Sequence, residues 1–193
     1  MIIGVDLDDT LASCIKYFLD FYNDKHSTEF IIDDVKAYGL WEIFGCSKES
    51  VMDDIAEFYA HPDFDNMTPI EGSVQAIQRL AEEHDIYVIT ARPSYLEDKI
   101  RNRIESNYGS CFRDIILTNQ VFEKDDARKK SDICNDLGAK LMIEDSVSHA
   151  YDCVSEGIDV FLMDMPWNQS YNADDKITRV YSWKDIEKEI NLG

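Results

Sequence analysis

Short apolar segments alternate along the chain with longer segments of helical periodicity, and this alternation restricts the fold more than any other feature. The apolar segments are rich in Ile, Val and Leu and comprise residues 2–5, 86–89, 115–117, 141–143 and 160–163. Strands buried on both faces of a parallel sheet have this composition. The longer segments carry apolar residues three and four positions apart and comprise residues 71–83, 95–106, 130–137, 146–155 and 182–190. We therefore predict an α/β fold, a Rossmann-like parallel sheet of about five strands with helices on both faces.

One stretch interrupts this alternation. Residues 14–66 lie between the first strand and the next helix, and a connection between a strand and a helix needs far fewer residues. The stretch has helical periodicity and contains 11 of the 22 aromatic residues, which suffices for an apolar centre of its own. We predict a small helical cap over residues 14–66, inserted into a core formed by residues 1–13 and 67–193.

An acidic motif, Asp6-Leu7-Asp8-Asp9-Thr10, follows the first predicted strand. Asp6 and Asp8 are two positions apart, so both side chains can point to the carboxyl edge of the sheet, where open α/β sheets bind ligands. Clustered carboxylates repel one another unless a cation joins them, and oxygen ligands select a hard cation such as Mg²⁺. The alternative is that one Asp caps the following helix and the others are solvated.

Three further groups of polar residues lie at the same predicted edge. Thr90 and Arg92 follow the second strand, Glu144 and Asp145 follow the fourth, and Lys130 begins the helix before the fourth. Hydroxyl, guanidinium and ammonium groups suit phosphate oxygens, and the acidic pair offers another Mg²⁺ ligand. Each group also has a structural reading, because Thr, Asp and Ser often begin helices and a lysine pair is usually solvated.

In this order the motifs resemble those of the haloacid dehalogenase superfamily of phosphohydrolases: Asp-x-Asp-x-Thr after strand one, Thr after strand two, Lys at a later helix, and an acidic pair after strand four. Within it, residues 70–72 (IEG), 88–93 (VITARP), 130–134 (KSDIC) and 143–146 (IEDS) are similar to the 5′(3′)-deoxyribonucleotidase family (5′-nucleotidase, deoxy, type C). The resemblance covers most of the predicted core, and residues 14–66 occupy the position of that family's small helical cap.

The resemblance implies a role for each of five residues. Asp6 would be the nucleophile that forms an aspartyl-phosphate, and Asp8 the general acid and base, with a pKa raised by neighbouring carboxylates. Asp6, Asp145 and the backbone carbonyl of Asp8 would hold Mg²⁺. Thr90 and Lys130 would bind the transferring phosphoryl group.

Two residues near these motifs have open roles. Arg92 can assist phosphate binding, or it can form an ion pair with Glu97 or Asp98. Glu144 can steady the metal site or point away from it, and we do not assign it as a direct ligand.

The resemblance favours a Mg²⁺-dependent phosphomonoesterase acting on (deoxy)nucleoside monophosphates. Trp41, Phe18, Phe44 and Tyr17 are candidates for stacking on a base, although each can instead belong to the apolar centre of the cap. The loop Pro166-Trp167-Asn168 can close the pocket or only pack against it. The alternatives are a phosphatase of another small phosphate ester, such as a sugar phosphate or phosphoglycolate, and a non-enzymatic phosphate-responsive regulator.

Charge and composition narrow the choice of partners. The formal net charge is −20, which disfavours nucleic acid polymers and anionic membranes, because both bind through clustered Lys and Arg. There is no apolar run long enough to span a bilayer and no export signal, and the five cysteines are scattered. We expect a cytoplasmic monomer or homodimer that binds a small phosphorylated metabolite.

Overall fold

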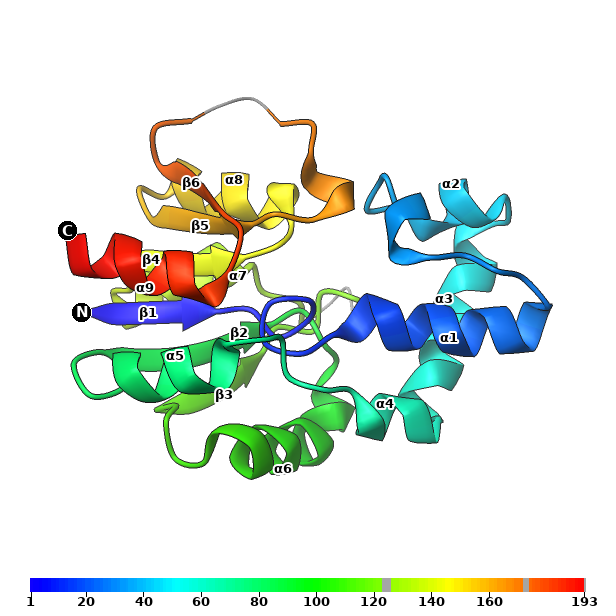
Figure 1. The fold of residues 1–193 in the computed structure, drawn as a ribbon, viewed down its shortest axis with the longest axis horizontal. Helices are drawn as coiled ribbons and strands as arrows, with labels where there is room; N and C mark the ends of the chain where they lie inside the picture. The colour runs from blue at the N-terminus through cyan, green and yellow to red at the C-terminus, as the bar shows by residue number, and fades with distance from the viewer. Residues whose placement is uncertain (123–125, 172–173, 193) are drawn as a thin grey trace.

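The computed structural model describes residues 1–122, 126–171 and 174–192, with side chains up to residue 190. Its centre is a sheet of six strands: β1 (Ile2–Val5), β2 (Asp85–Thr90), β3 (Asp114–Leu117), β4 (Leu141–Glu144), β5 (Asp159–Met163) and β6 (Ile177–Val180). The strand order is β3-β2-β1-β4-β5-β6 and every neighbouring pair is parallel (Figure 1). The predicted α/β class and parallel sheet are confirmed.

The sixth strand was not predicted. β6 lies at an edge of the sheet, and only its end residues Ile177 and Val180 are buried. Thr178 and Arg179 lie between them, so the segment lacks the continuous apolar run that marks the central strands. Edge strands often carry such polar positions.

Helices cover both faces of the sheet. One apolar cluster joins the sheet to α5 (Ser73–Leu80), α6 (Glu97–Tyr108) and α9 (Trp183–Leu192), and a second joins it to α7 (Lys130–Leu137) and α8 (Val147–Ser155). Gly4 allows α7 to lie close to the sheet, because a Cβ at this position would lie 3.3 Å from Cys134 Sγ and 2.8 Å from Met142 Sδ.

The stretch between β1 and α5 is helical. It contains α1 (Cys14–His26), a 3₁₀ turn η1 (Ile32–Asp34), α2 (Leu40–Phe44), α3 (Lys48–Ala60) and α4 (Pro62–Asn66). In Figure 1 these elements lie beyond the end toward which β1 points. We call α1 to α4 the cap helices.

The cap helices pack through aromatic rings. The rings of Phe18 and Phe58 meet edge to face at 5.5 Å, and those of Tyr22 and Phe44 stack at 3.9 Å. The same apolar cluster continues into the sheet through Phe64. In the described residues, no helix is long and apolar enough to cross a membrane.

Candidate active site

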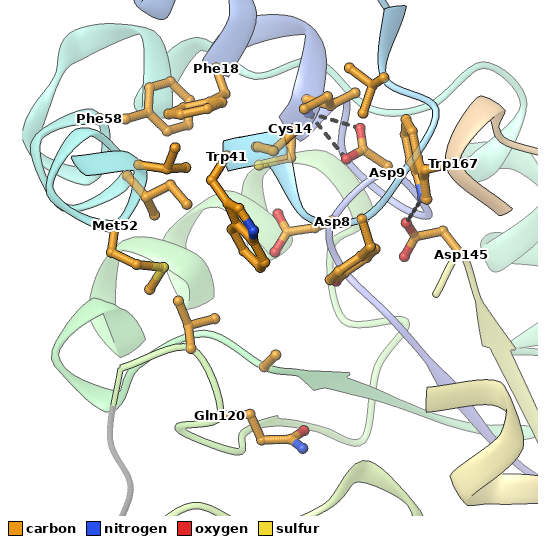
Figure 2. Close-up of a pocket in the computed structure, with 18 of the residues that line it drawn as sticks. Asp8, Asp9, Cys14, Phe18, Trp41, Met52, Phe58, Gln120, Asp145 and Trp167 are labelled. Atoms are coloured by element: carbon orange, nitrogen blue, oxygen red, sulfur yellow. Dashed lines mark hydrogen bonds between the residues drawn. The ribbon is translucent and has the colours of Figure 1, made fainter. Parts of the chain in front are cut away.

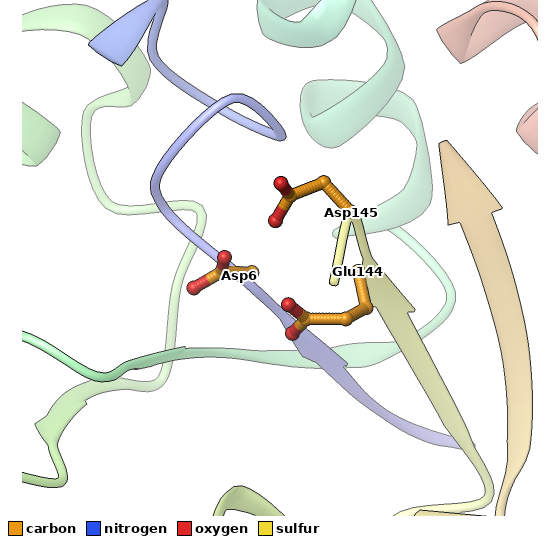
Figure 3. Close-up of side chains that lie close together, drawn as sticks. All are labelled: Asp6, Glu144 and Asp145. Atoms are coloured by element: carbon orange, nitrogen blue, oxygen red, sulfur yellow. The ribbon is translucent and has the colours of Figure 1, made fainter. Parts of the chain in front are cut away.

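Three buried carboxylates meet at the carboxyl ends of β1 and β4 (Figure 3). These strands are neighbours, and Val5 pairs with Ile143, so Asp6 lies beside Glu144 and Asp145. One oxygen from each of the three carboxylates lies within 4.8 Å of the others. Burial, together with the charge of Glu144, raises the pKa of Asp6 to about 7 and that of Asp145 well above its usual range.

Lys130 joins this cluster from the first residue of α7. Its Nζ lies 2.7 Å from Asp6 Oδ1 and 2.8 Å from Glu144 Oε2, and the side chain is buried. Burial alone would raise the pKa of Glu144, but Lys130 and His149 outweigh it and lower this pKa to about 2. Lys130 is therefore not a solvated lysine but a fixed positive charge inside the cluster.

The oxygen atoms of the cluster fit a divalent cation. Asp6 Oδ1 is buried and accepts no hydrogen bond from the described residues, although Lys130 is close. When all three carboxylates are ionised, as in binding a metal, one lysine leaves two uncompensated negative charges, which a divalent ion would balance. An all-oxygen set of donors suits Mg²⁺.

Asp8 is held apart from this cluster by Arg92. Arg92 Nε donates to Asp8 Oδ2 at 2.9 Å, and a terminal nitrogen of the guanidinium donates to Oδ1. The alternative in which Arg92 forms an ion pair with Glu97 or Asp98 is wrong, since Arg92 pairs with Asp8 and Glu97 pairs with Arg101. The predicted rise in the pKa of Asp8 is also wrong. Burial does raise this pKa, but the adjacent Arg92 guanidinium outweighs burial and lowers it.

Asp9 lines the cavity, and Thr90 is buried behind it at the end of β2. Asp9 has a φ of 55°, and its carboxylate accepts a hydrogen bond from the Ile15 N–H at 3.0 Å, so it shapes the turn from β1 into α1. Thr90 ends β2 and is fully buried, and its hydroxyl accepts a hydrogen bond from the Arg92 N–H at 3.4 Å.

A cavity of about 380 Å³ opens above the carboxylates (Figure 2). Asp6, Asp8 and Asp145 line one part of it, and cap residues including Trp41 and Phe18 line another. Phe44 and Tyr17 do not line it. Phe44 stacks on Tyr22 inside the cap, as the alternative reading of these aromatics allowed.

The loop after β5 also reaches the cavity. It forms a 3₁₀ turn, η3 (Pro166–Asn168), in which Trp167 lines the cavity and its Nε1 donates to Asp145 Oδ2 at 2.8 Å (Figure 2). The Asn168 amide donates to the backbone oxygens of Asp145 at 2.8 Å and Met163 at 2.6 Å. The loop therefore orients Asp145 from both its side chain and its backbone.

The comparison with protein families shows which family the chain belongs to. A family model described as "5′ nucleotidase, deoxy (Pyrimidine), cytosolic type C protein" matches residues 1–192. The chain belongs to this family. The type C nucleotidase family and the site above make the protein a phosphoric monoester hydrolase, and the resemblance seen in the sequence is confirmed.

Two curated proteins are similar to most of this chain. The curated protein "Putative nucleotidase BH1399" of Halalkalibacterium halodurans is 24% identical over 190 residues, which cover 97% of this chain and 91% of that protein. A phage T4 protein described as an uncharacterized 32.4 kDa protein is 22% identical over 92% of this chain, which spans 64% of that protein's length.

Solved structures share the fold of this chain at low sequence identity. The haloacid dehalogenase-like hydrolase SP0104 of Streptococcus pneumoniae superposes with a TM-score of 0.72 at 12% identity, covering 98% of this chain and 97% of that chain. The HAD-hydrolase YfnB of Bacillus subtilis, solved bound to magnesium, superposes with a TM-score of 0.66 at 16% identity, covering 98% of both chains. The fold is thus that of haloacid dehalogenase-type hydrolases.

Several residues of the site were not foreseen. His149 contacts Glu144 at 3.3 Å. The cavity is lined by His149 and also by Tyr38, Met52 and Gln120. Of these only His149 had a signal in the sequence, since it lies one helical turn into the helix after the acidic pair.

The cluster predicts how the stability of the metal-free protein depends on pH. Asp6 has a pKa of about 7 when folded, against 3.8 ordinarily, so between these values the folded state binds a proton that the unfolded state has released. The free energy of unfolding should therefore fall as the pH rises from about 4 to about 7. Urea unfolding in a chelator across this range measures it, and in Asp6→Asn the fall should be smaller. An equal fall in both proteins would contradict the role given to Asp6.

Proposed function

We propose that the protein is a Mg²⁺-dependent phosphatase that removes phosphate from (deoxy)nucleoside monophosphates through an aspartyl-phosphate on Asp6. The observation that carries this proposal is the position of the Asp6 carboxylate, buried beside Lys130 at the base of an apolar cavity. The proposal includes residues 14–66 as the cap over a core of residues 1–13 and 67–193. It also includes a cytoplasmic setting, which the five free cysteines favour.

Each half of the reaction uses residues already described. An Asp6 oxygen attacks phosphorus, the bond to the substrate oxygen breaks, and Asp8 in its protonated form, which Arg92 keeps scarce and strongly acidic, gives that oxygen a proton. Water then attacks the phosphorus, losing a proton to Asp8, and the bond to Asp6 breaks. Lys130 and Thr90 would stabilise the charge on the phosphoryl oxygens.

Asp6, Asp145 and the backbone carbonyl of Asp8 would hold the Mg²⁺, which supplies positive charge to the phosphoryl oxygens when bound. Glu144 suits a supporting role better than that of a ligand. One of its oxygens accepts from Lys130 at 2.8 Å, and the other accepts from the Ser146 N–H at 3.2 Å.

The cavity favours a substrate with a flat apolar part. It has the size of a small-molecule site, and Trp41 and Phe18 offer rings against which a base can lie. A sugar phosphate or phosphoglycolate has no such part. A phosphate-release panel of nucleotides and sugar phosphates tests this, and a clear preference for sugar phosphates would overturn the nucleotide assignment. Turnover of any ester would remove the regulator alternative.

Trp167→Phe should weaken Mg²⁺ binding by about 10- to 100-fold, because Asp145 Oδ2 loses the N–H that orients it. Calorimetric titration of the protein with Mg²⁺ alone measures this. Trp41→Phe is the matched control, since Trp41 lines the same cavity: its Mg²⁺ affinity should be unchanged and its KM for a nucleotide raised. Equal Mg²⁺ affinity in Trp167→Phe and the unmodified protein would contradict the prediction.

A further inference from the structure

Arg92 is a buried arginine that contacts both Asp8 and residues at the two ends of the cap. Its side chain is 1% exposed, although it follows a strand end beside the cavity. Nε donates to both oxygens of Asp8, at 2.9 and 3.1 Å, and a terminal nitrogen donates to Oδ1. Two donors in one plane fix both the position and the plane of a carboxylate, which a lysine cannot do.

The guanidinium that holds Asp8 is also enclosed by the two ends of the cap. It lies over the ring of Phe64 at 4.4 Å and that of Tyr59 at 5.5 Å. Its terminal nitrogen contacts Cys14 Sγ at 3.5 Å and Met67 Sδ at 3.8 Å. Cys14 begins α1, whereas the other three belong to α3, α4 and the segment that returns to the core.

Residues 59–67, which lead from α3 back to the core, are hydrogen bonded to α6. Arg103 donates to the backbone oxygen of Met67 at 2.8 Å and also to that of Phe64. Lys99 Nζ donates to the backbone oxygen of Tyr59 at 3.3 Å. Residues 59–67 thus set the position of the Arg92 guanidinium. Arg92 could turn toward a bound phosphate only by losing its contacts with Tyr59, Phe64 and Met67.

We propose that Arg92 is a positioning residue, which holds the Asp8 carboxylate toward the leaving oxygen and makes that orientation depend on how residues 59–67 seat against the core. The inference rests on the proposed function, in which Asp8 exchanges the proton. It replaces the earlier expectation that Arg92 binds phosphate.

Two substrates separate this role from a merely structural one. A nucleoside monophosphate releases an alkoxide that needs the proton of Asp8, whereas p-nitrophenyl phosphate releases a stable anion that does not. In pre-steady-state experiments with substrate in excess, Arg92→Lys should slow nucleoside release in the first turnover by about 100-fold. The initial burst of p-nitrophenolate should stay within a few-fold of the unmodified protein, and the KM for the nucleotide should change little.

Two further variants complete the experiment. Arg101→Lys, at an exposed arginine that pairs with Glu97, should match the unmodified protein with both substrates. Phe64→Leu removes the ring beneath the guanidinium and keeps every charge, so it should show the pattern of Arg92→Lys to a smaller degree. It also serves as the test if Arg92→Lys does not fold.

The outcomes test the positioning role of Arg92 separately from the proton-transfer role of Asp8. If Asp8→Asn kept full nucleotide turnover, the proton-transfer role of Asp8 would be wrong. If Asp8→Asn lost turnover while Arg92→Lys kept normal rates with both substrates, only the role of Arg92 would be overturned. An equal loss with both substrates would also overturn it, because that pattern indicates phosphate binding or general structural damage.

Discussion

Asp6→Asn should abolish turnover of every phosphate ester while leaving the metal-free protein at least as stable as the unmodified chain. An amide is a poor nucleophile toward phosphorus, so kcat should fall by at least about 1,000-fold. The fold should tolerate the change because Asp6 is buried beside Glu144 and Asp145, and burial and repulsion both oppose its charge. Removing that charge relieves the repulsion among the carboxylates.

Phosphate release and urea unfolding in a chelator measure the two parts of this prediction. Asp9→Asn is a useful comparison, because Asp9 is buried in the same loop and hydrogen bonds the Ile15 N–H, which an amide oxygen can still accept. Its activity should fall much less than that of Asp6→Asn. Phosphatase activity retained by Asp6→Asn would show that another residue is the nucleophile.

Lys130→Met should cause the largest loss of stability among single substitutions at the site. Its ammonium lies 2.7 Å from Asp6 and 2.8 Å from Glu144, and all three side chains are buried. Removing one partner of a buried ion pair leaves an uncompensated charge, which costs about 3–5 kcal/mol in the free energy of unfolding. The loss should shrink at lower pH, where protonation of the carboxylates removes the charge that lacks a partner.

The neighbouring lysine offers a matched control. Lys129 pairs with Asp152 at 2.8 Å on the exposed surface, so Lys129→Met should leave the unfolding curve unchanged. Lys130→Met should also reduce kcat by about 100- to 1,000-fold, because the phosphoryl charge would lose a fixed cation. Equal effects of the two substitutions on stability would contradict the assignment of Lys130 to the cluster.

The sequence predicted the sheet and its site through local patterns. Continuous apolar runs mark the strands that are buried on both faces, and polar residues just after such runs must meet at one edge of a parallel sheet. Asp6, Asp145 and Lys130 are close together for this reason. β6 was missed because an edge strand needs only two buried positions, at Ile177 and Val180.

Tertiary contacts account for what the sequence could not predict. Arg92 has acidic residues five and six positions later, but it pairs with Asp8, which is 84 positions away. Local spacing favours the nearer partners, and only the packing of Phe64 around the guanidinium decides otherwise. Similarly, Phe44 and Trp41 look alike in the sequence, and the fold puts one ring against Tyr22 and the other against the cavity.

The strand order has a consequence for how the protein forms during synthesis. β1 is made first, but its partners on either side are β2 and β4, and Ile3 pairs with both Ile86 and Leu141. Such distant pairings form slowly, since a long loop must close before the contacts stabilise it. A nascent chain therefore carries Asp6 long before Asp145 and Lys130 have joined it. Until β4 is in place, Asp6, the nucleophile we propose, lies at the open edge of an incomplete sheet, so the proposed chemistry becomes possible only late in folding.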